Sequence, residues 1–236
     1  MNSDPHILQA FDRDLHTVQA LVLKMGSLVE DAIVSAAQGL DTRDTDLANR
    51  VRRGDAAVDA LEEQVNFECA RLIALRAPTA SDLRTVLTVM KVASNLERCG
   101  DYAKNLAKRS TVLNQMPPIG DSSASVLRMA KAVQQQLKDA LDAYIKRDAD
   151  LAAAVRLRDN EIDQIYNALF REILTHMMED PRNITGCMHL NFIAKNIERV
   201  GDHATGIAEQ VIYLVTGTLP ADQRPKGDTT AFETGA

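Results

Sequence analysis

The sequence contains few residues that interrupt a helix. It has no tryptophan, and only 7 prolines and 11 glycines in 236 residues. An all-β sandwich needs turn signals about every 8–12 residues, so this composition disfavours that fold class. Cysteine is scarce as well: Cys69, Cys99 and Cys187 are far apart and no CxxC pair occurs, which argues against a zinc ribbon or a disulfide framework. No apolar run approaches the length of about 18 residues that a membrane-spanning helix requires.

Charge and the first residues narrow the class of protein further. The chain has 27 Lys and Arg against 33 Asp and Glu, a net charge of −6, whereas a nucleic-acid-binding protein is usually basic. The opening MNSDPHILQAF lacks the basic segment and the apolar run of a secretory signal. Apolar residues make up 45% of the chain, which is enough for a packed core. We therefore predict a folded, reduced, cytoplasmic protein that binds no nucleic acid.

The prolines divide the chain into windows in which long helices can run. Apolar residues there recur at helical spacings of three and four, and no strand-like alternation is sustained. DTRDTD (41–46) and, less strongly, RDADL (147–151) subdivide two windows, because short polar side chains favour helix ends. In the turn RAPTASD (76–82), Ser81 is the expected cap. The expected helices are 6–41, 45–76, 81–111, 122–147, 149–179 and 184–216.

Six helices in two sets of three indicate a duplication. Residues 93–107 align with 194–208 at a shift of 101, with eight of fifteen positions identical, and 51–59 align with 155–163 at a shift of 104. The segment MPPIG (116–120) cannot continue a helix and separates the two repeats. We predict an all-α protein of two tandem antiparallel three-helix bundles, at 6–115 and 121–217, followed by a disordered tail at 218–236.

Each repeat carries the motif Glu-Arg-x-Gly-Asp, which puts two carboxylates on one face of a helix. Glu97 and Asp101 are four residues apart, and Glu198 and Asp202 repeat this spacing. If the preceding helix runs antiparallel, further acids reach the same height by reflection through the turn. Each repeat then gathers four carboxylates: Glu97, Asp101, Asp55 and Asp59 in the first, and Glu198, Asp202, Asp159 and Asp163 in the second.

Such a cluster needs cations nearby, and two explanations stay open. Oxygen-only ligands suit a metal ion such as Mg²⁺, Ca²⁺, Mn²⁺ or iron. Alternatively, the acids form a solvated face or pair with basic side chains, of which Arg98 and Arg199 are adjacent in sequence. Gly100 and Gly201 lie within helices, where glycine costs about 1 kcal/mol relative to alanine, and a close approach of two helices would explain them.

Other residues give little support for catalysis. The chain has no P-loop, GxGxxG or GxSxG motif, and the Glu-x-x-His spacing of di-iron bundles does not occur. His203 is expected to be a surface or interhelical histidine rather than a ligand. Met177, Met178 and Met188 are expected in the core.

Several segments together resemble the PhoU family of phosphate-specific transport system accessory proteins. The segments are ALRAPTASDLR (74–84), NLERCGDYAKNLAK (95–108), MMEDPRNIT (177–185) and NIERVGDHATGIAEQV (196–211), and the likeness covers about residues 6–217. Cys99 and Val200 stand where Ile is common in the family. Gly206 stands where the family usually has Asn, so the two halves need not bind ions equally.

The resemblance implies a non-enzymatic, homodimeric regulator. Such a protein reports phosphate sufficiency from the Pst phosphate ABC transporter to a PhoR-type sensor histidine kinase, associates peripherally with these membrane complexes, represses the phosphate regulon and restrains uptake. The resemblance also implies metal clusters at Glu97/Asp101 and Glu198/Asp202, with iron, zinc, manganese or magnesium as candidates. The alternatives are a carboxylate-bridged metal enzyme and a purely structural dimerising bundle. Direct phosphate sensing does not follow from the sequence, because acidic clusters repel phosphate unless a bound cation bridges them.

Overall fold

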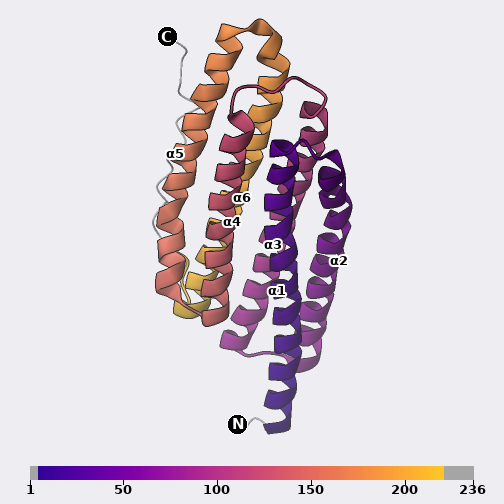
Figure 1. The fold of residues 1–236 in the computed structure, drawn as a ribbon. Coiled ribbons are helices and arrows are strands. Elements are labelled where there is room, and N and C mark those ends of the chain that lie inside the picture. The colour runs from indigo at the N-terminus through magenta and orange to yellow at the C-terminus, as the bar shows by residue number, and fades with distance from the viewer. Residues whose placement is uncertain (1–4, 221–236) are drawn as a thin grey trace.

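The computed structural model describes residues 5–220 and shows six long helices, with no strand in that range (Figure 1). The helices are α1 (Pro5–Asp41), α2 (Thr45–Arg76), α3 (Ala80–Leu113), α4 (Ser122–Lys146), α5 (Ala149–Glu179) and α6 (Ile184–Thr216), with a short 3₁₀ helix, η1 (Pro181–Asn183), before α6. The all-α prediction is confirmed, and every helix end lies within two residues of its expected position. Most of the tail predicted at 218–236 lies outside the described residues.

Short acidic side chains begin two of the helices, as the breaks in the sequence predict. Asp44 precedes α2, and its carboxylate accepts a hydrogen bond from the backbone N–H of Leu47 at 2.8 Å. Asp148 precedes α5 in the same way and accepts from the N–H of Leu151 at 2.9 Å. These contacts satisfy backbone donors that have no partner within the helix, so they fix where α2 and α5 start.

The start of α3 differs from the prediction. Ser81 is not the cap, because α3 already begins at Ala80 and Ser81 lies in its first turn. Thr79 occupies the N-cap position with an extended backbone (φ −76°, ψ 175°), and its hydroxyl lies 3.3 Å from a carboxylate oxygen of Asp82. The extended residue directly after the proline, Thr79, is therefore the N-cap, two residues before Ser81.

The two sets of three helices share one core. Within each set the three helices pack against one another, and α3 also packs along α6 while α1 packs along α4. All six helices run roughly along the long axis of the molecule (Figure 1). A single continuous cluster of buried apolar side chains connects them. The three-helix units at 6–115 and 121–217 therefore meet through a common apolar interior, and their independence as domains stays a prediction.

The contact between α3 and α6 relates the halves by a near two-fold axis. The Cys99 thiol lies 3.9 Å from the backbone oxygen of Val200, and these residues occupy equivalent positions in the two repeats. When equivalent residues of two antiparallel helices touch, the axis relating them passes close to that contact. Nearby, Nδ1 of His203 lies 2.8 Å from Oδ1 of Asn95 across the same pair of helices. The expectation of an interhelical histidine is therefore confirmed.

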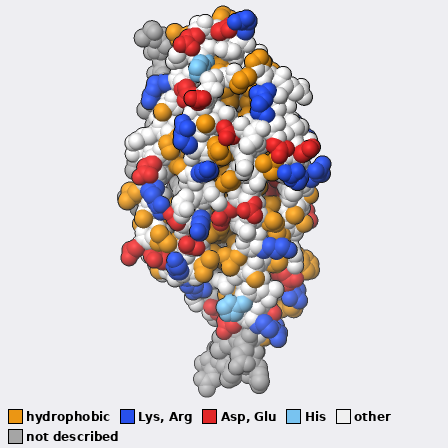
Figure 2. Space-filling view, viewed as in Figure 1, with side chains coloured by type: hydrophobic (Ala, Val, Ile, Leu, Met, Phe, Trp, Pro, Cys, Tyr) orange, Lys and Arg blue, Asp and Glu red, His pale blue; other side chains and the backbone are white. Residues whose placement is uncertain are grey.

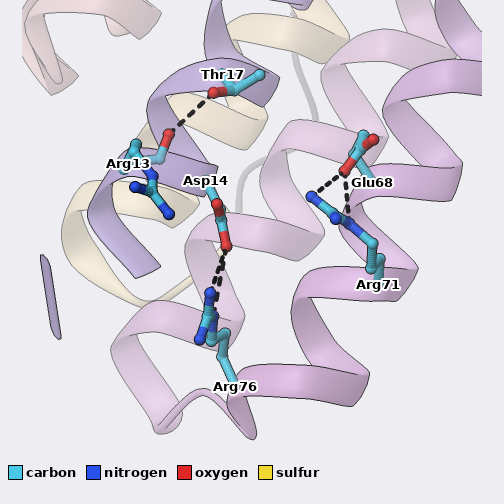
Figure 3. A network of polar contacts seen from close by, with 6 residues as sticks. All are labelled: Arg13, Asp14, Thr17, Glu68, Arg71 and Arg76. Atoms are coloured by element: carbon cyan, nitrogen blue, oxygen red, sulfur yellow. Dashed lines mark hydrogen bonds and ion pairs between the residues drawn. The ribbon is translucent and has the colours of Figure 1, made fainter. Parts of the chain in front are cut away.

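Polar contacts join neighbouring elements at the ends of the bundle. Arg76, the last residue of α2, pairs with Asp14 of α1 at 3.0 Å, whereas Arg71 and Glu68 pair within α2 at 2.9 Å (Figure 3). The pair within α2 is exposed and contributes little to stability. The contact between Arg76 and Asp14 has more structural effect, because it fixes the end of α2 against α1.

The linker between the repeats is held by the turn between α1 and α2. The guanidinium of Arg43 donates to the backbone oxygens of Asn114 and Met116, at 2.6 and 2.7 Å. Ile119 then inserts its side chain into the core. The linker is therefore docked against the first repeat rather than extended away from it.

Two of the three methionines predicted in the core lie on the surface instead. Met177 packs against the core, but Met178 is 75% exposed and Met188 is 42% exposed, so the core assignment of these two was wrong. They lie on outward faces of α5 and α6, which the other described helices leave exposed. All three cysteines are buried and free, as the absence of a disulfide framework in the sequence predicts. Of the helices in residues 5–220, none is both long and apolar enough to cross a bilayer.

Candidate functional site

The acidic face of the first repeat is built where α2 and α3 approach closely. A Cβ atom added at Gly100 of α3 would lie 3.3 Å from Val58 Cγ1 and 3.5 Å from Asp55 Oδ1, both on α2. Glycine therefore lets α3 approach the buried carboxylate of Asp55, which is only 6% exposed. The level placement of Asp55 and Asp101 agrees with the antiparallel reflection, and the close approach of the two helices agrees with the explanation offered for Gly100.

Lys104 is a member of this face that the sequence reasoning missed. Its ammonium contacts the carboxylate of Asp55 on α2 and lies 3.7 Å from Asp101 Oδ1 on its own helix. The contact with Asp55 raises the pKa of Lys104, so the lysine stays charged. The spacing of three residues after Asp101 could have revealed it, because residues i and i+3 share a helix face. The first repeat thus carries a built-in cation among its acids.

The other two acids predicted for this face, Asp59 and Glu97, are also influenced by the charges of their neighbours. Burial, and next the charge of Asp55, raises the pKa of Asp59, although this side chain is on the exposed edge of the face. Burial also raises the pKa of Glu97, with Asp101 adding to the rise and Arg98 opposing it. Arg98 contacts both carboxylates of its helix, at 3.3 Å from Glu97 and 3.5 Å from Asp101. The four acids predicted for this repeat therefore interact electrostatically, and Lys104 and Arg98 are the basic side chains among them.

The acidic face of the second repeat is more deeply buried. Glu198 is 4% exposed, and burial, followed by the charge of Asp202, raises the pKa of Glu198 to about 7. Lys195 lies 3.1 Å from Glu198 Oε2, and its positive charge opposes the rise in the pKa of Glu198. The negative charge of Asp163 adds to the rise. Asp159 and Asp163 on α5 are 3% and 4% exposed. Carboxylates so far from water require strong partners, because an uncompensated buried charge is costly.

Helix α4 completes the second face with a hydrogen-bonding side chain. Nε2 of Gln136 donates to Asp159 Oδ1 and to Thr205 Oγ1, both at 3.2 Å. A Cβ at Gly201 would lie 3.5 Å from Asp159 Oδ1, which repeats the close approach seen at Gly100. Thr205 stands where Lys104 stands in the first repeat, at the shift of 101. The two faces thus share their carboxylates, but a lysine contacts the buried aspartate of the first and a glutamine donates a hydrogen bond to that of the second.

Gly206, which departs from the family pattern, does not lie on the acidic face of the second repeat. A Cβ at Gly206 would lie 3.1 Å from Oδ1 of Asn95 on α3, so this glycine faces the contact between the halves. Its absence of a side chain makes room for the pair of Asn95 and His203. The departure therefore affects the packing of α3 against α6 rather than the acidic face.

The donor set suits a hard metal ion, but the ligands are not drawn together. Within residues 5–220, no three Asp, Glu, His or Cys side chains converge closely enough to hold a metal ion as they stand. Carboxylate oxygens are nevertheless the ligands that Mg²⁺, Mn²⁺ and iron accept. Burial is the main cause of the raised pKa values of Glu97 and Glu198, and neighbouring acids add to it. At the two faces the ammonium groups of Lys104 and Lys195 already contact carboxylates, those of Asp55 and Glu198 respectively.

The glycine at the close approach leads to a mutational prediction. Gly100→Leu should lower the free energy of unfolding by about 2 kcal/mol or more, because the added side chain meets Val58 and Asp55. Gly54→Leu is the matched control: nothing lies within 4 Å of a Cβ there, and leucine is a better helix former. Urea denaturation of both variants measures the difference. An unchanged midpoint for Gly100→Leu would contradict the close approach.

Known proteins share this architecture over nearly the whole chain. The profile of the PhoU domain matches twice, over residues 22–110 and 126–211. The phosphate-specific transport system accessory protein PhoU homolog of Caulobacter vibrioides is 44% identical over 223 residues, covering 94% of this chain and 97% of the relative. The protein of that name from Xylella fastidiosa is 42% identical over 233 residues, covering 98% and 96%.

Solved structures agree with the sequence comparison. The crystal structure of PhoU from Pseudomonas aeruginosa superposes with a TM-score of 0.85 at 39% identity, covering 88% of this chain and all of that one. The phosphate transport system regulatory protein PhoU from Streptococcus pneumoniae gives a TM-score of 0.80 at 32% identity. Fold and site define a duplicated helical-bundle protein with an acidic face on each repeat. The chain belongs to the PhoU family.

Proposed function

We propose that this chain is the accessory protein of a phosphate-specific transport system and regulates phosphate uptake without catalysing a reaction. The observation that carries the proposal is the match of the PhoU domain to both repeats, together with relatives that are named as accessory proteins of that system. The long helices offer extended outer faces, and on the face in Figure 2 acidic and basic side chains are interspersed. Mixed charges of this kind are the ordinary exterior of a folded protein, so the proposal rests on the family match.

The finer role we propose is that of an adaptor on the cytoplasmic side of the membrane. The chain would dock on the Pst phosphate ABC transporter and on a PhoR-type sensor histidine kinase, and would keep the phosphate regulon repressed when phosphate is plentiful. A homodimer is part of this proposal and can be measured by light scattering.

A deletion strain tests the regulatory role. Without this chain, the phosphate-responsive genes should stay active in phosphate-rich medium, because the signal of phosphate sufficiency is no longer passed from the transporter to the kinase. Transcript levels in high and low phosphate measure this, with the strain carrying the intact gene on a plasmid as the control. If the phosphate-responsive genes of the deletion strain were still repressed normally in phosphate-rich medium, the proposed regulatory role would be wrong. A variant lacking Glu97, Asp101, Glu198 and Asp202 that restores full repression would favour a purely structural bundle.

The acidic faces form the second part of the proposal. Glu97, Asp101, Asp55 and Asp59 would hold metal ions in the first repeat, and Glu198, Asp202, Asp159 and Asp163 in the second. A bound iron, zinc, manganese or magnesium ion would supply positive charge between α2 and α3 or between α5 and α6. Its effect would be to neutralise repulsion among the carboxylates and to fix the two helices together.

Metal content after purification tests this part. The Glu97→Ala/Asp101→Ala variant should retain less metal per chain than the unaltered protein, by as much as the first repeat contributes. The control variant, Asp150→Ala/Glu161→Ala, removes two exposed acids of α5 that belong to neither predicted set of ligands. Elemental analysis of the three proteins decides the matter, and equal metal content in all of them would refute ion binding at this face.

A further inference from the structure

A cleft between α3 and α6 gathers side chains that donate hydrogen bonds. It is lined by Asn105, Lys108, Arg109, Val112, His189 and Asn196, and its volume is about 410 Å³. Two of these residues are permanent cations at neutral pH, and none is acidic, in a protein whose net charge is −6. A cleft of this size suits a small ligand, and its lining favours a negatively charged one.

The guanidinium of Arg109 is held in place by its neighbours. It lies over the ring of Phe192 at 4.2 Å from the centroid, and its Nη1 is 3.4 Å from Nδ1 of His189. Within residues 5–220, neither Arg109 nor Lys108 forms an ion pair with a carboxylate, unlike Lys104 one turn earlier. An arginine stacked on an aromatic ring has already lost much of its rotamer freedom, so less is lost when it binds an anion.

His189 adds a neutral donor to the same cleft. Because a guanidinium can only donate, Nδ1 of His189 accepts from Arg109 and the ring proton resides on Nε2. Burial, and next the charge of Arg109, lowers the pKa of His189, so the imidazole is neutral at pH 7. The cleft then offers the fork of an arginine, the point charge of a lysine, an imidazole N–H and two side-chain amides. This is the donor set that several oxygens of one tetrahedral anion can share.

The internal duplication provides a comparison within the same molecule. At the shift of 101, the positions equivalent to Asn105, Lys108, Arg109, Val112, His189 and Asn196 hold Gly206, Glu209, Gln210, Tyr213, Thr88 and Asn95. Both cations and the histidine are therefore missing from the second location, and Glu209 pairs there with Arg156 at 3.2 Å. One cation, Arg84, lies near the second location, over the ring of Tyr213 at 5.7 Å from the centroid, but the two adjacent cations and the histidine have no counterpart at the equivalent positions.

We propose that the cleft between α3 and α6 binds the phosphate group of a small ligand, either inorganic phosphate or a phosphorylated metabolite. The site lies on the contact between the two repeats, about two turns along α3 from Asp101, so it is separate from the acidic faces. Occupation of the cleft would bridge α3 and α6 with charge-assisted hydrogen bonds. The inference goes beyond the proposed function and does not depend on it.

Calorimetric titration of the full chain with sodium phosphate tests the inference. The protein is treated with a chelator beforehand, so that no metal ion can bridge phosphate to the acidic faces, and sodium chloride of equal ionic strength serves as the blank. We expect saturable binding that Arg109→Gln weakens roughly tenfold or more. Arg84→Gln is the matched control, because Arg84 stacks on Tyr213 across the same two helices at their other end, and it should bind as the unaltered protein does.

Two further measurements guard against a folding defect in the variant. Lys108 is exposed, so Lys108→Gln should fold normally and still bind more weakly. In the unaltered protein, phosphate should raise the pKa of His189, followed by NMR of the imidazole, because an anion offsets the charge of Arg109. Tighter binding of AMP that needs the same residues would support the inference and identify a phosphorylated metabolite. No saturable binding of phosphate or AMP, equal binding by all variants, or binding only to phosphatidylglycerol vesicles would overturn it.

Discussion

Leu96→Ala should lower the free energy of unfolding by about 3 kcal/mol. Leu96 is fully buried in α3, the helix that packs against α1, α2 and α6. Truncation removes apolar contacts and leaves a cavity that four packed helices cannot easily fill, and such changes cost about 2–5 kcal/mol. Because one apolar cluster connects both repeats, we also expect the molecule to unfold in a single transition.

Urea denaturation followed by circular dichroism measures the loss. Leu75→Ala is the matched control, since Leu75 near the end of α2 is 66% exposed and its truncation should change the stability by less than about 0.5 kcal/mol. Similar losses for the two variants would show that α3 is not central to the core. Two separate transitions in the unaltered protein would instead show that the repeats are independent domains.

Glu198→Gln should stabilise the chelator-treated protein at pH 8 and have little effect near pH 4. In the folded chain, burial and Asp202 raise the pKa of Glu198 to about 7, from 4.5 in an unfolded chain. The folded state therefore binds the proton more tightly, so the stability of the unaltered protein falls as pH rises between these values. Below the lower value the carboxyl is protonated in both states and nothing is gained. Above pH 7 the glutamine variant avoids a buried charge, a difference of about 3 kcal/mol.

Thermal unfolding of both proteins across this pH range tests the sign. Glu97→Gln is the internal control, because Glu97 occupies the equivalent position in the first repeat and is less deeply buried. Its stabilisation should be smaller at every pH. A stability difference for Glu198→Gln that does not grow between pH 4 and pH 8 would contradict the raised pKa. Adding a metal ion that binds the second face should reverse the advantage of glutamine, since the carboxylate is then a ligand.

The helices and their limits could be read from the sequence because their causes are local. Proline, the polar breaks around Asp44 and Asp148 and the spacing of apolar residues act over a few positions, and each operates in the folded protein as predicted. Reflection through the turn allowed the placement of Asp55 near the level of Asp101, since two antiparallel helices joined by a short turn have a nearly fixed register. Ser81 and the exposed Met178 were misjudged, because the exact cap and the outer side of a wide apolar stripe depend on neighbouring helices.

The sequence by itself determined six helices, two repeats and the acids that each repeat brings to one height. Only the tertiary structure decided that the repeats join along α3 and α6, that Lys104 contacts Asp55, and that Gln136 from α4 takes the corresponding place beside Asp159. Helix periodicity and capping depend on residues within about one turn of each other, so a single sequence displays them. Partners separated by tens or hundreds of residues meet only when all the apolar faces are buried together, and that packing is what gives each carboxylate its neighbours.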